Sequence, residues 1–322
     1  MVDAVVEATP AGDSQHPLVV LVGPTASGKT SLSLKLAEEF NGEIVSCDAV
    51  AVYRGLDVGS AKPTAAEQAR VPHHALDILD PDEASTAGDY ARAARAALAE
   101  IKTRGGLPIV TGGTGLYLRA LLEGLAPAPP SDEELRERLR ERAAEHGSEY
   151  LYRLLERLDP VAAGAIHPND VPKMIRSIEV TLAAQQRQSE QWQLGRDRLL
   201  GFRVLQIGLN PPRMALYERI NDRAARMFDE GLLEETAAAR ERFGDACRAL
   251  GSLGYAQAVA MLRGEMPRLE AIAAAQQGHR NYAKRQMTWF RRDKQIQWLQ
   301  GFGDDPDVQA HAAEMVRQHL AG

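Results

Sequence analysis

The sequence predicts an α/β fold in which a parallel sheet is flanked by helices, with a helical insertion inside the same core. Three observations predict it. Buried apolar runs alternate with helical patterns, a glycine-rich loop joins the first run to a helix, and a proline-rich turn interrupts the alternation. With 322 residues, of which 44% are hydrophobic and 25% charged, the chain has the composition of a globular protein with a substantial core. No run approaches the roughly 18 uninterrupted apolar residues of a membrane span.

Four apolar runs predict buried strands of a parallel sheet, at 18–22, 43–47, 107–111 and 203–209. Helical patterns separate the first three, and the pattern at 88–104 places Ala94, Leu98 and Ile101 on a single face. Beyond residue 210 the pattern is helical, apart from a candidate late strand at 295–299. A sheet of this kind binds ligands at the carboxyl ends of its strands.

The alternation breaks at a proline-rich turn, 126–130, and the chain is then helix-rich until the strand at 203–209 resumes the α/β character. We therefore predict one catalytic core, built from 17–126 and 200–322, with a helical insertion at 127–199. Residues 1–16 carry three acids and no Lys or Arg. We expect them to form a disordered tail rather than a secretory signal.

Charge and cysteine content narrow the class of protein. The two cysteines, Cys47 and Cys247, are too few for a disulfide framework or an all-cysteine zinc site, which favours a reducing cytoplasm. We expect a monomer. The net charge is −6, yet residues 280–294 carry six Lys or Arg against one acid. A second group of cations lies on or beside one predicted helix: Arg213, Arg219, Arg223 and Arg226. Such clusters suit phosphate backbones, although solvated helix faces are commoner.

The glycine-rich loop has the G-x-x-x-x-G-K-[ST] spacing of a phosphate-binding loop, and it lies between a strand and a helix as that motif requires. It reads Gly23, Pro24, Thr25, Ala26, Ser27, Gly28, Lys29 and Thr30. Its glycines let backbone N–H groups turn onto phosphate oxygens, and the helix N-terminus adds favourable partial charge. Lys29 supplies a point charge, and the Thr30 hydroxyl is placed to hold Mg²⁺. The loop therefore predicts a P-loop NTPase-like sheet that binds a di- or triphosphate.

Two other strand ends carry candidate residues. The strand at 107–111 runs into Gly112-Gly113-Thr114-Gly115 with no carboxylate, which disfavours a hydrolytic motor. These glycines suit a close backbone approach to a ligand. Asp48 follows the strand at 43–47, on the same rim as the phosphate loop. Each has a structural alternative, because Thr114 can cap a helix and Asp48 can stabilise a turn.

Further segments make the chain resemble the tRNA dimethylallyltransferase family from about residue 17 to residue 300. Together they are far more specific than the loop alone. They are 52–63, 72–74, 112–117, 121–125, 167–170, 219–223, 253–255 and 283–291. The chain departs from the family pattern at Ala49 and Ala51, where polar residues are common. It also departs at 172–176, which keeps two cations but lacks the glutamine of a Gln-Arg-x-x-Arg pattern.

The resemblance implies transfer of a dimethylallyl group from dimethylallyl diphosphate to the N6 amine of the adenosine immediately 3′ of the anticodon in tRNA. It implies Asp48 as the general base, Arg223 and residues 23–30 at the diphosphate, and Thr114 between the base and the diphosphate. Mg²⁺ is the implied cofactor, with no membrane and no obligate protein partner. The resemblance places tRNA contacts at Asp48, Ala49, Val50, Ala51, Thr114, Arg136, Pro172, Lys173, Met174, Ile175, Arg176, Leu250, Gly251, Ser252, Leu253, Gly254 and Tyr255. Charge adds Lys284 and Arg285 to them, Trp289 is a candidate for base stacking or for the core, and His73 and His74 are expected to serve loop structure.

Three other functions stay open. An adenylate isopentenyltransferase shares the fold and the donor but acts on free adenine nucleotides, whereas the basic helical segments here favour RNA. A small-molecule P-loop kinase would transfer a phosphoryl group from ATP. A nucleotide-binding switch would bind at the loop and catalyse nothing.

Overall fold

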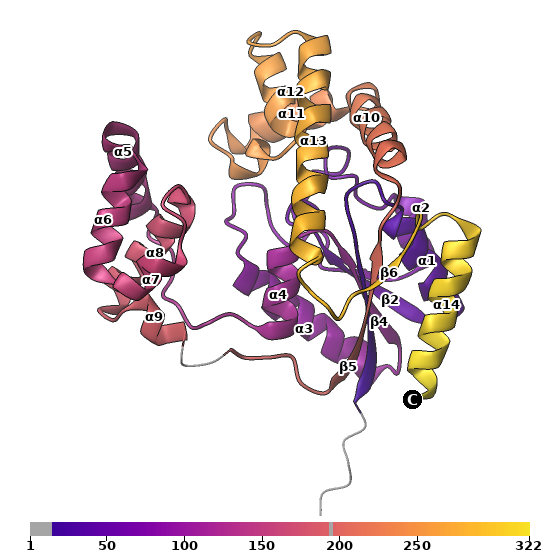
Figure 1. Cartoon of the computed structure of the whole chain (residues 1–322). Coiled ribbons are helices and arrows are strands. Elements are labelled where there is room, and N and C mark those ends of the chain that lie inside the picture. The colour runs from indigo at the N-terminus through magenta and orange to yellow at the C-terminus, as the bar shows by residue number, and fades with distance from the viewer. Residues whose placement is uncertain (1–14, 193–195) are drawn as a thin grey trace, which may run out of the picture. The chain divides into compact units, whose positions relative to one another are not determined.

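A computed structural model describes residues 15–192 and 196–322 (Figure 1). The chain forms two compact units. The first comprises the residues up to Leu122 together with Leu199–Gly322, and the second is Glu123–Arg198, where the sequence predicts an insertion at 127–199. Most of the predicted tail, 1–16, lies outside the described residues. His16, however, already belongs to the first strand, where it pairs with Phe202.

A six-stranded parallel sheet forms the centre of the first unit, in the order β3-β2-β4-β1-β5-β6. This confirms the predicted fold class and all five predicted strands, and it adds a short edge strand. The strands are β1 (His16–Val22), β2 (Gly42–Cys47), β3 (His73–His74), β4 (Leu107–Gly112), β5 (Phe202–Leu209) and β6 (Gln297–Leu299). Val22 and Cys47 both lie opposite Gly112, so the carboxyl ends of β1, β2 and β4 are level.

Strand β1 is apolar throughout because both of its faces are covered. Leu18, Val20 and Val22 belong to one hydrophobic core, whereas Val19 and Leu21 belong to the core on the opposite face. A strand buried on both faces needs a continuous apolar run rather than an alternating one.

Helices cover both faces of the sheet (Figure 1). Leu32 of α1 and Val316 of α14 share a core with Val19, whereas Leu98 of α3 and Leu121 of α4 share the other core with Val20. The helices are α1 (Lys29–Glu39), α2 (Ala65–Arg70), α3 (Ala87–Thr103), α4 (Gly115–Glu123), α10 (Arg213–Asp229), α11 (Leu232–Phe243), α12 (Tyr255–Leu262), α13 (Arg268–Phe290) and α14 (Pro306–Ala321), with a 3₁₀ turn η2 (Arg248–Gly251). Among the residues that the structure describes, none of the helices has the length and apolar character needed to cross a bilayer.

The second unit is helical. Its helices are α5 (Glu133–His146), α6 (Ser148–Leu158), α7 (Pro160–Ala165), α8 (Val171–Ala184) and α9 (Gln188–Gln191). They surround a small apolar core of their own, which includes Leu139, Leu155, Met174 and Ile178. Asp159 and Asp170 cap α7 and α8 by accepting backbone N–H groups.

Candidate active site

The phosphate loop lies between β1 and α1, at the carboxyl edge of the sheet. Gly28 has a φ of +86°, a conformation that glycine adopts readily, and its carbonyl accepts the N–H of Leu32 as the helix begins. The Lys29 ammonium folds over the loop and donates to the carbonyls of Gly23, at 3.1 Å, and Pro24, at 2.8 Å. Burial lowers the pKa of Lys29 to about 7, and nearby Arg223 adds to the effect. A bound anion would restore the charge of this group.

Arg223 reaches the same loop from α10. Its guanidinium donates to the Thr25 hydroxyl, and burial lowers its pKa to about 10, which still leaves it charged at neutral pH. Within the described part of the chain it forms no ion pair, although Asp48 lies close enough to favour its charged form. Arg223 is therefore not a solvent-exposed charge on a helix face. It is a part-buried cation whose guanidinium contacts the phosphate loop.

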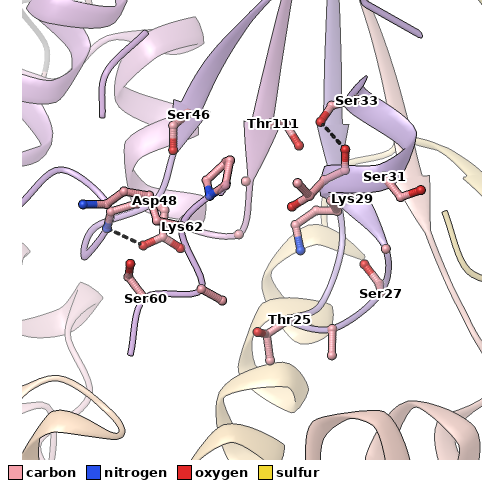
Figure 2. A pocket seen from close by; sticks show the side chains of 18 of the residues that line it. Thr25, Ser27, Lys29, Ser31, Ser33, Ser46, Asp48, Ser60, Lys62 and Thr111 are labelled. Carbon is pink, nitrogen blue, oxygen red and sulfur yellow. Dashed lines mark hydrogen bonds between the residues drawn. The ribbon is translucent and has the colours of Figure 1, made fainter. Parts of the chain in front are cut away.

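The loop opens onto a cavity of about 630 Å³, which is lined by residues at the carboxyl ends of β1, β2 and β4. Figure 2 shows Thr25, Ser27 and Lys29 on one side of this cavity and Asp48, Ser60 and Lys62 across from them. Arg223 from α10, Tyr282 and Gln286 from α13, and Gly113 after β4 also line it. A cavity that lies at a strand-end rim and is lined by cations suits a phosphorylated ligand.

Asp48 stabilises a turn and also lines the cavity. Its Oδ1 accepts the backbone N–H groups of Val50, at 2.8 Å, and Ala51, at 3.1 Å, which stabilises the turn after β2. Its Oδ2 makes no hydrogen bond within the described residues, and Asp48 lines the cavity. One carboxylate oxygen therefore holds the turn, while the other is available to accept a proton.

Thr114 links the turn after β2 to the loop after β4. Its hydroxyl oxygen accepts the backbone N–H of Ala49 at 3.1 Å, and its own N–H donates to the Cys47 carbonyl at 3.2 Å. Thr114 thereby holds the Asp48 turn against the loop after β4. The structure brings Asp48, Thr114, Arg223 and the phosphate loop together, as their sequence positions predict.

Two residues of α13 complete the site, and the sequence analysis did not assign them a role. Gln286 accepts the Thr25 N–H at 2.8 Å and donates to the Gly113 carbonyl at 3.0 Å, so it bridges the phosphate loop and the loop after β4. Tyr282, one turn earlier, lies close to Thr114, and burial raises its pKa to about 12. Their i, i+4 spacing puts both side chains on the face of α13 that meets the cavity.

The glycines after β4 have a packing role that the sequence did not predict. A Cβ atom at Gly113 would lie 2.0 Å from Gln286 Nε2, and one at Gly115 would lie 2.3 Å from Trp289 Cδ1. These glycines admit side chains of α13, and because Gly113 also lines the cavity, the close approach of a ligand stays a prediction. Trp289 packs over Gly115 and remains 39% exposed, which makes it only partly a core residue.

The proposed tRNA contacts fall on both units and differ in accessibility. Lys284 and Arg285 are exposed on α13, and Lys173 and Pro172 are exposed at the start of α8. Arg136 and Arg176 are part-buried in the second unit and pair with a buried carboxylate, Glu179. Lys173 pairs with Asp170 at the surface, and Lys173, Lys284 and Arg285 all face solvent.

Several other residues of this set have buried side chains, so a contact with RNA, which stays a prediction, would fall to their backbone atoms. Met174 and Ile175 face the core of the second unit because α8 is amphipathic there. Leu250 and Tyr255 are buried in the first unit, where the Tyr255 hydroxyl donates to Glu235 at 2.5 Å. Ala51 is buried as well, so the absence of a polar side chain at this position suits its surroundings.

His73 and His74 form strand β3 instead of the loop expected for them. The His74 ring contacts the Glu43 carboxylate at 2.7 Å, which is a structural pairing at the sheet edge. His73 lines the cavity, and burial lowers its pKa.

The comparisons with known proteins cover nearly the whole chain. A family model described as IPP transferase matches residues 51–293, and one described as isopentenyl transferase matches residues 16–77. The chain belongs to the IPP transferase family. It is 60% identical over 300 residues to a tRNA dimethylallyltransferase of Koribacter versatilis, covering 93% of this chain and 98% of that protein. It is 49% identical to a second one, from Solibacter usitatus, covering 94% and 99%.

A solved structure extends this likeness to the fold. The full-length tRNA isopentenylpyrophosphate transferase from Bacillus halodurans matches this IPP transferase family member with a TM-score of 0.71 and 36% identity. The match covers 95% of this chain and 97% of that one. The likeness to these family members therefore includes both the P-loop-like sheet and the segments that line the cavity at its carboxyl edge.

The residues present fit a magnesium ion next to a bound diphosphate. Thr30 and Thr111 both line the cavity, and the buried Thr111 hydroxyl has no hydrogen-bond partner within the described residues. The described part of the chain holds no cluster of three or more His, Cys, Asp or Glu that would cage a metal. Mg²⁺ commonly uses one or two protein oxygens and completes its shell with phosphate and water oxygens, so hydroxyl ligands suffice.

Proposed function

We propose that this protein is a tRNA dimethylallyltransferase. It transfers a dimethylallyl group from dimethylallyl diphosphate to the N6 amine of the adenosine immediately 3′ of the anticodon, and it releases diphosphate. One observation carries the proposal: a single cavity joins a phosphate loop, with the part-buried cations Lys29 and Arg223, to the carboxylate of Asp48. Relatives named tRNA dimethylallyltransferase, at 60% and 49% identity over almost their whole length, support the same activity.

The chemistry begins with the leaving group. Breaking the bond between the allylic carbon and oxygen places negative charge on diphosphate, so fixed positive charge at that position lowers the barrier. Lys29, Arg223 and the N–H groups of the loop supply it. Mg²⁺ bound by Thr30, with Thr111 beside it, would add a further positive charge at the diphosphate oxygens.

The acceptor amine needs a base. The lone pair of the exocyclic amine is delocalised into the adenine ring, and the amine must lose a proton as the new carbon–nitrogen bond forms. Asp48 Oδ2 is the acceptor for that proton, while Oδ1 stays bound to the backbone of Val50 and Ala51. Thr114 and Tyr282 lie beside Asp48 and orient its carboxylate. The adenosine has to leave the anticodon-loop stack to reach this cavity.

Binding of the RNA draws on the exposed cations of both units. We infer that Lys284 and Arg285 in the first unit and Lys173 in the second contact the phosphate backbone. Trp289, part-exposed near Lys284 and Arg285, offers an aromatic face for an unstacked base. A cytoplasmic location and a monomer without an obligate protein partner complete the proposal.

Mass spectrometry of nucleosides tests this function. An unmodified tRNA transcript is incubated with the protein, Mg²⁺ and dimethylallyl diphosphate, then digested. We expect one N6-dimethylallyladenosine per tRNA, and none from a transcript with another base at that position. Prenylation of free AMP, ADP or ATP without modification of tRNA would favour an adenylate isopentenyltransferase, a possibility that the short isopentenyl transferase match at 16–77 raises. Phosphoryl transfer from ATP would favour a kinase.

A further inference from the structure

The segment Leu56–Pro63 forms the wall of the cavity across from the phosphate loop. Ser60, Ala61, Lys62 and Pro63 line the cavity, and Figure 2 shows Ser60 and Lys62 beside Asp48. The wall is a run of turns with no helix or strand to fix it. Its position therefore depends on the side chains that hold it from outside.

Lys62 holds the inner end of this wall. Its buried ammonium donates to the Tyr53 carbonyl at 2.9 Å, to Asp57 Oδ1 at 2.5 Å and to Asp77 Oδ1 at 2.6 Å. All three N–H donors are used, and two carboxylates compensate the charge. Lys62 is therefore an anchor of the wall and not a cation for the substrate.

Glu235, in the first turns of α11, holds the outer edge. Its Oε2 accepts the backbone N–H groups of Asp57 at 2.7 Å and Val58 at 2.9 Å, and its Oε1 accepts that of Gly59 at 3.2 Å. Three consecutive backbone donors thus converge on one carboxylate from a helix 176 to 178 positions away in the chain. Hydrogen bonds to a charged acceptor are among the stronger ones in proteins.

Tyr255 fixes this carboxylate in turn. Its hydroxyl donates to Glu235 Oε1 at 2.5 Å, and its ring lies flush against Gly59, where a Cβ atom would come within 2.5 Å of Tyr255 Cε2. The phenol is fully buried. Glu235, Tyr255 and Gly59 therefore form one rigid contact behind the wall, away from the reacting groups.

We propose that Glu235 is a positioning residue that keeps the cavity wall closed against water during prenyl transfer. The inference rests on the proposed function, because it concerns the fate of the allylic donor. As diphosphate leaves, the allylic carbon becomes electrophilic. A water molecule that reached it would form a new carbon–oxygen bond while the bond to diphosphate breaks, and its proton would pass to solvent. The products would be dimethylallyl alcohol and diphosphate, with no change of oxidation state.

The test compares Glu235→Gln with Glu234→Gln, a matched change at the exposed neighbouring glutamate of α11. Glutamine keeps the size of Glu235, but its NH₂ group would face backbone N–H donors and open the contact. Diphosphate release and dimethylallyl incorporation into tRNA are measured in the same reaction. We expect Glu235→Gln to transfer about tenfold more slowly or worse and to release at least about twice as much diphosphate as it transfers. Glu234→Gln should retain the wild-type rate and a ratio of one.

A ratio of one in Glu235→Gln, at any rate of transfer, would overturn the proposal. Tyr255→Phe covers the case in which Glu235→Gln does not fold, since it removes one donor and keeps the ring. We expect a smaller excess of diphosphate from it, and a ratio of one there would equally count against the proposal.

Hydrogen exchange of the amides of Asp57, Val58 and Gly59 in the full chain separates this inference from the proposed function. We expect faster exchange in Glu235→Gln than in Glu234→Gln, and equal exchange would contradict the contact itself. If the wild-type protein did not prenylate tRNA, the proposed function would fail while this exchange result still stood.

Discussion

The unpaired arginine of the first unit and the paired arginines of the second show two opposite uses of charge. Arg223 is part-buried with a hydroxyl partner and no ion pair within the described residues, so its charge projects into the cavity. Arg136 and Arg176 instead converge on the fully buried Glu179 carboxylate, at 2.9 and 2.5 Å. Burial alone raises the pKa of Glu179, but the two arginines and the Asp132 N–H together more than offset it and hold that pKa below its ordinary value. A cation in a cavity without an ion-pair partner suits an anion site, whereas a paired one suits a structural link.

This difference in charge pairing places the chemistry in the first unit. Among the variants of that unit, we expect the largest effect from Asp48→Asn. Asparagine keeps the side-chain oxygen that accepts from Val50 and Ala51 but cannot take a proton from the amine. We expect the single-turnover rate to fall by about 10²–10⁴-fold, with tRNA affinity within about twofold. A weakened tRNA complex with an unchanged single-turnover rate would remove Asp48 from the role of base.

Arg223→Ala tests the uncompensated cation itself. We expect kcat/KM for dimethylallyl diphosphate to fall by about 10²–10³-fold, because one fixed charge at the departing diphosphate is lost. Arg213→Ala, at an exposed position of the same helix outside the lining of this cavity, is the matched control and should change it less than about twofold. Equal effects in the two variants would mean that its position in the cavity does not single out Arg223.

Glu179→Gln tests the compensated pair in the second unit. We expect it to destabilise that unit by about 2–3 kcal/mol, less than for a fully buried pair because Arg136 and Arg176 are 21% and 33% exposed. Denaturant unfolding followed by a probe in the second unit measures this. The Michaelis constant for dimethylallyl diphosphate should stay unchanged, and a large rise in it would erase the distinction between the two units.

The affinity for the prenyl donor should depend on pH through the charge of Lys29. Lys29 has a pKa of about 7 in the free protein, and a bound diphosphate favours its charged form. Affinity for the donor should therefore fall as pH rises through about 7, by up to tenfold per pH unit. Lys29→Arg keeps the charge throughout this range and should lose the dependence, as titration calorimetry at several pH values would reveal.

The smallest effect is expected at Lys173, an exposed cation of the second unit whose partner, Asp170, is also at the surface. Lys173→Ala should raise the Michaelis constant for tRNA severalfold and make its dependence on salt shallower. Arg153→Ala, an exposed cation on α6, serves as the comparison. Identical salt slopes for both variants would remove Lys173 from the RNA contact.

The parts of the fold and the site that are contiguous in the sequence could be predicted from it. The phosphate loop and the apolar strands are contiguous in sequence, so they predicted the sheet, its carboxyl rim and the meeting of Asp48 with Thr114. The contacts that set the geometry of the site are not contiguous. Gln286 reaches Thr25 across 261 positions and Glu235 reaches Val58 across 177, and no periodicity signals such a pairing. Strand β3 has only two residues, too few for any pattern.

Burial within matched motifs also escaped the sequence analysis. Met174, Ile175 and Tyr255 lie in segments that the resemblance links to tRNA, yet each side chain faces a core. For Met174 and Ile175 a signal was present, because the apolar stripe of α8 continues through Ile178 to the same side. For Tyr255 the deciding partner, Glu235, lies on another helix.

Titration calorimetry with diphosphate, the released product, shows whether Arg223 forms part of an anion site. We expect one binding site in the wild-type protein. Its affinity should fall at least tenfold in Arg223→Ala, because one cation opposite the anion is lost, and should stay unchanged in Glu179→Gln. Equal diphosphate affinity in wild type and Arg223→Ala would contradict this role of Arg223.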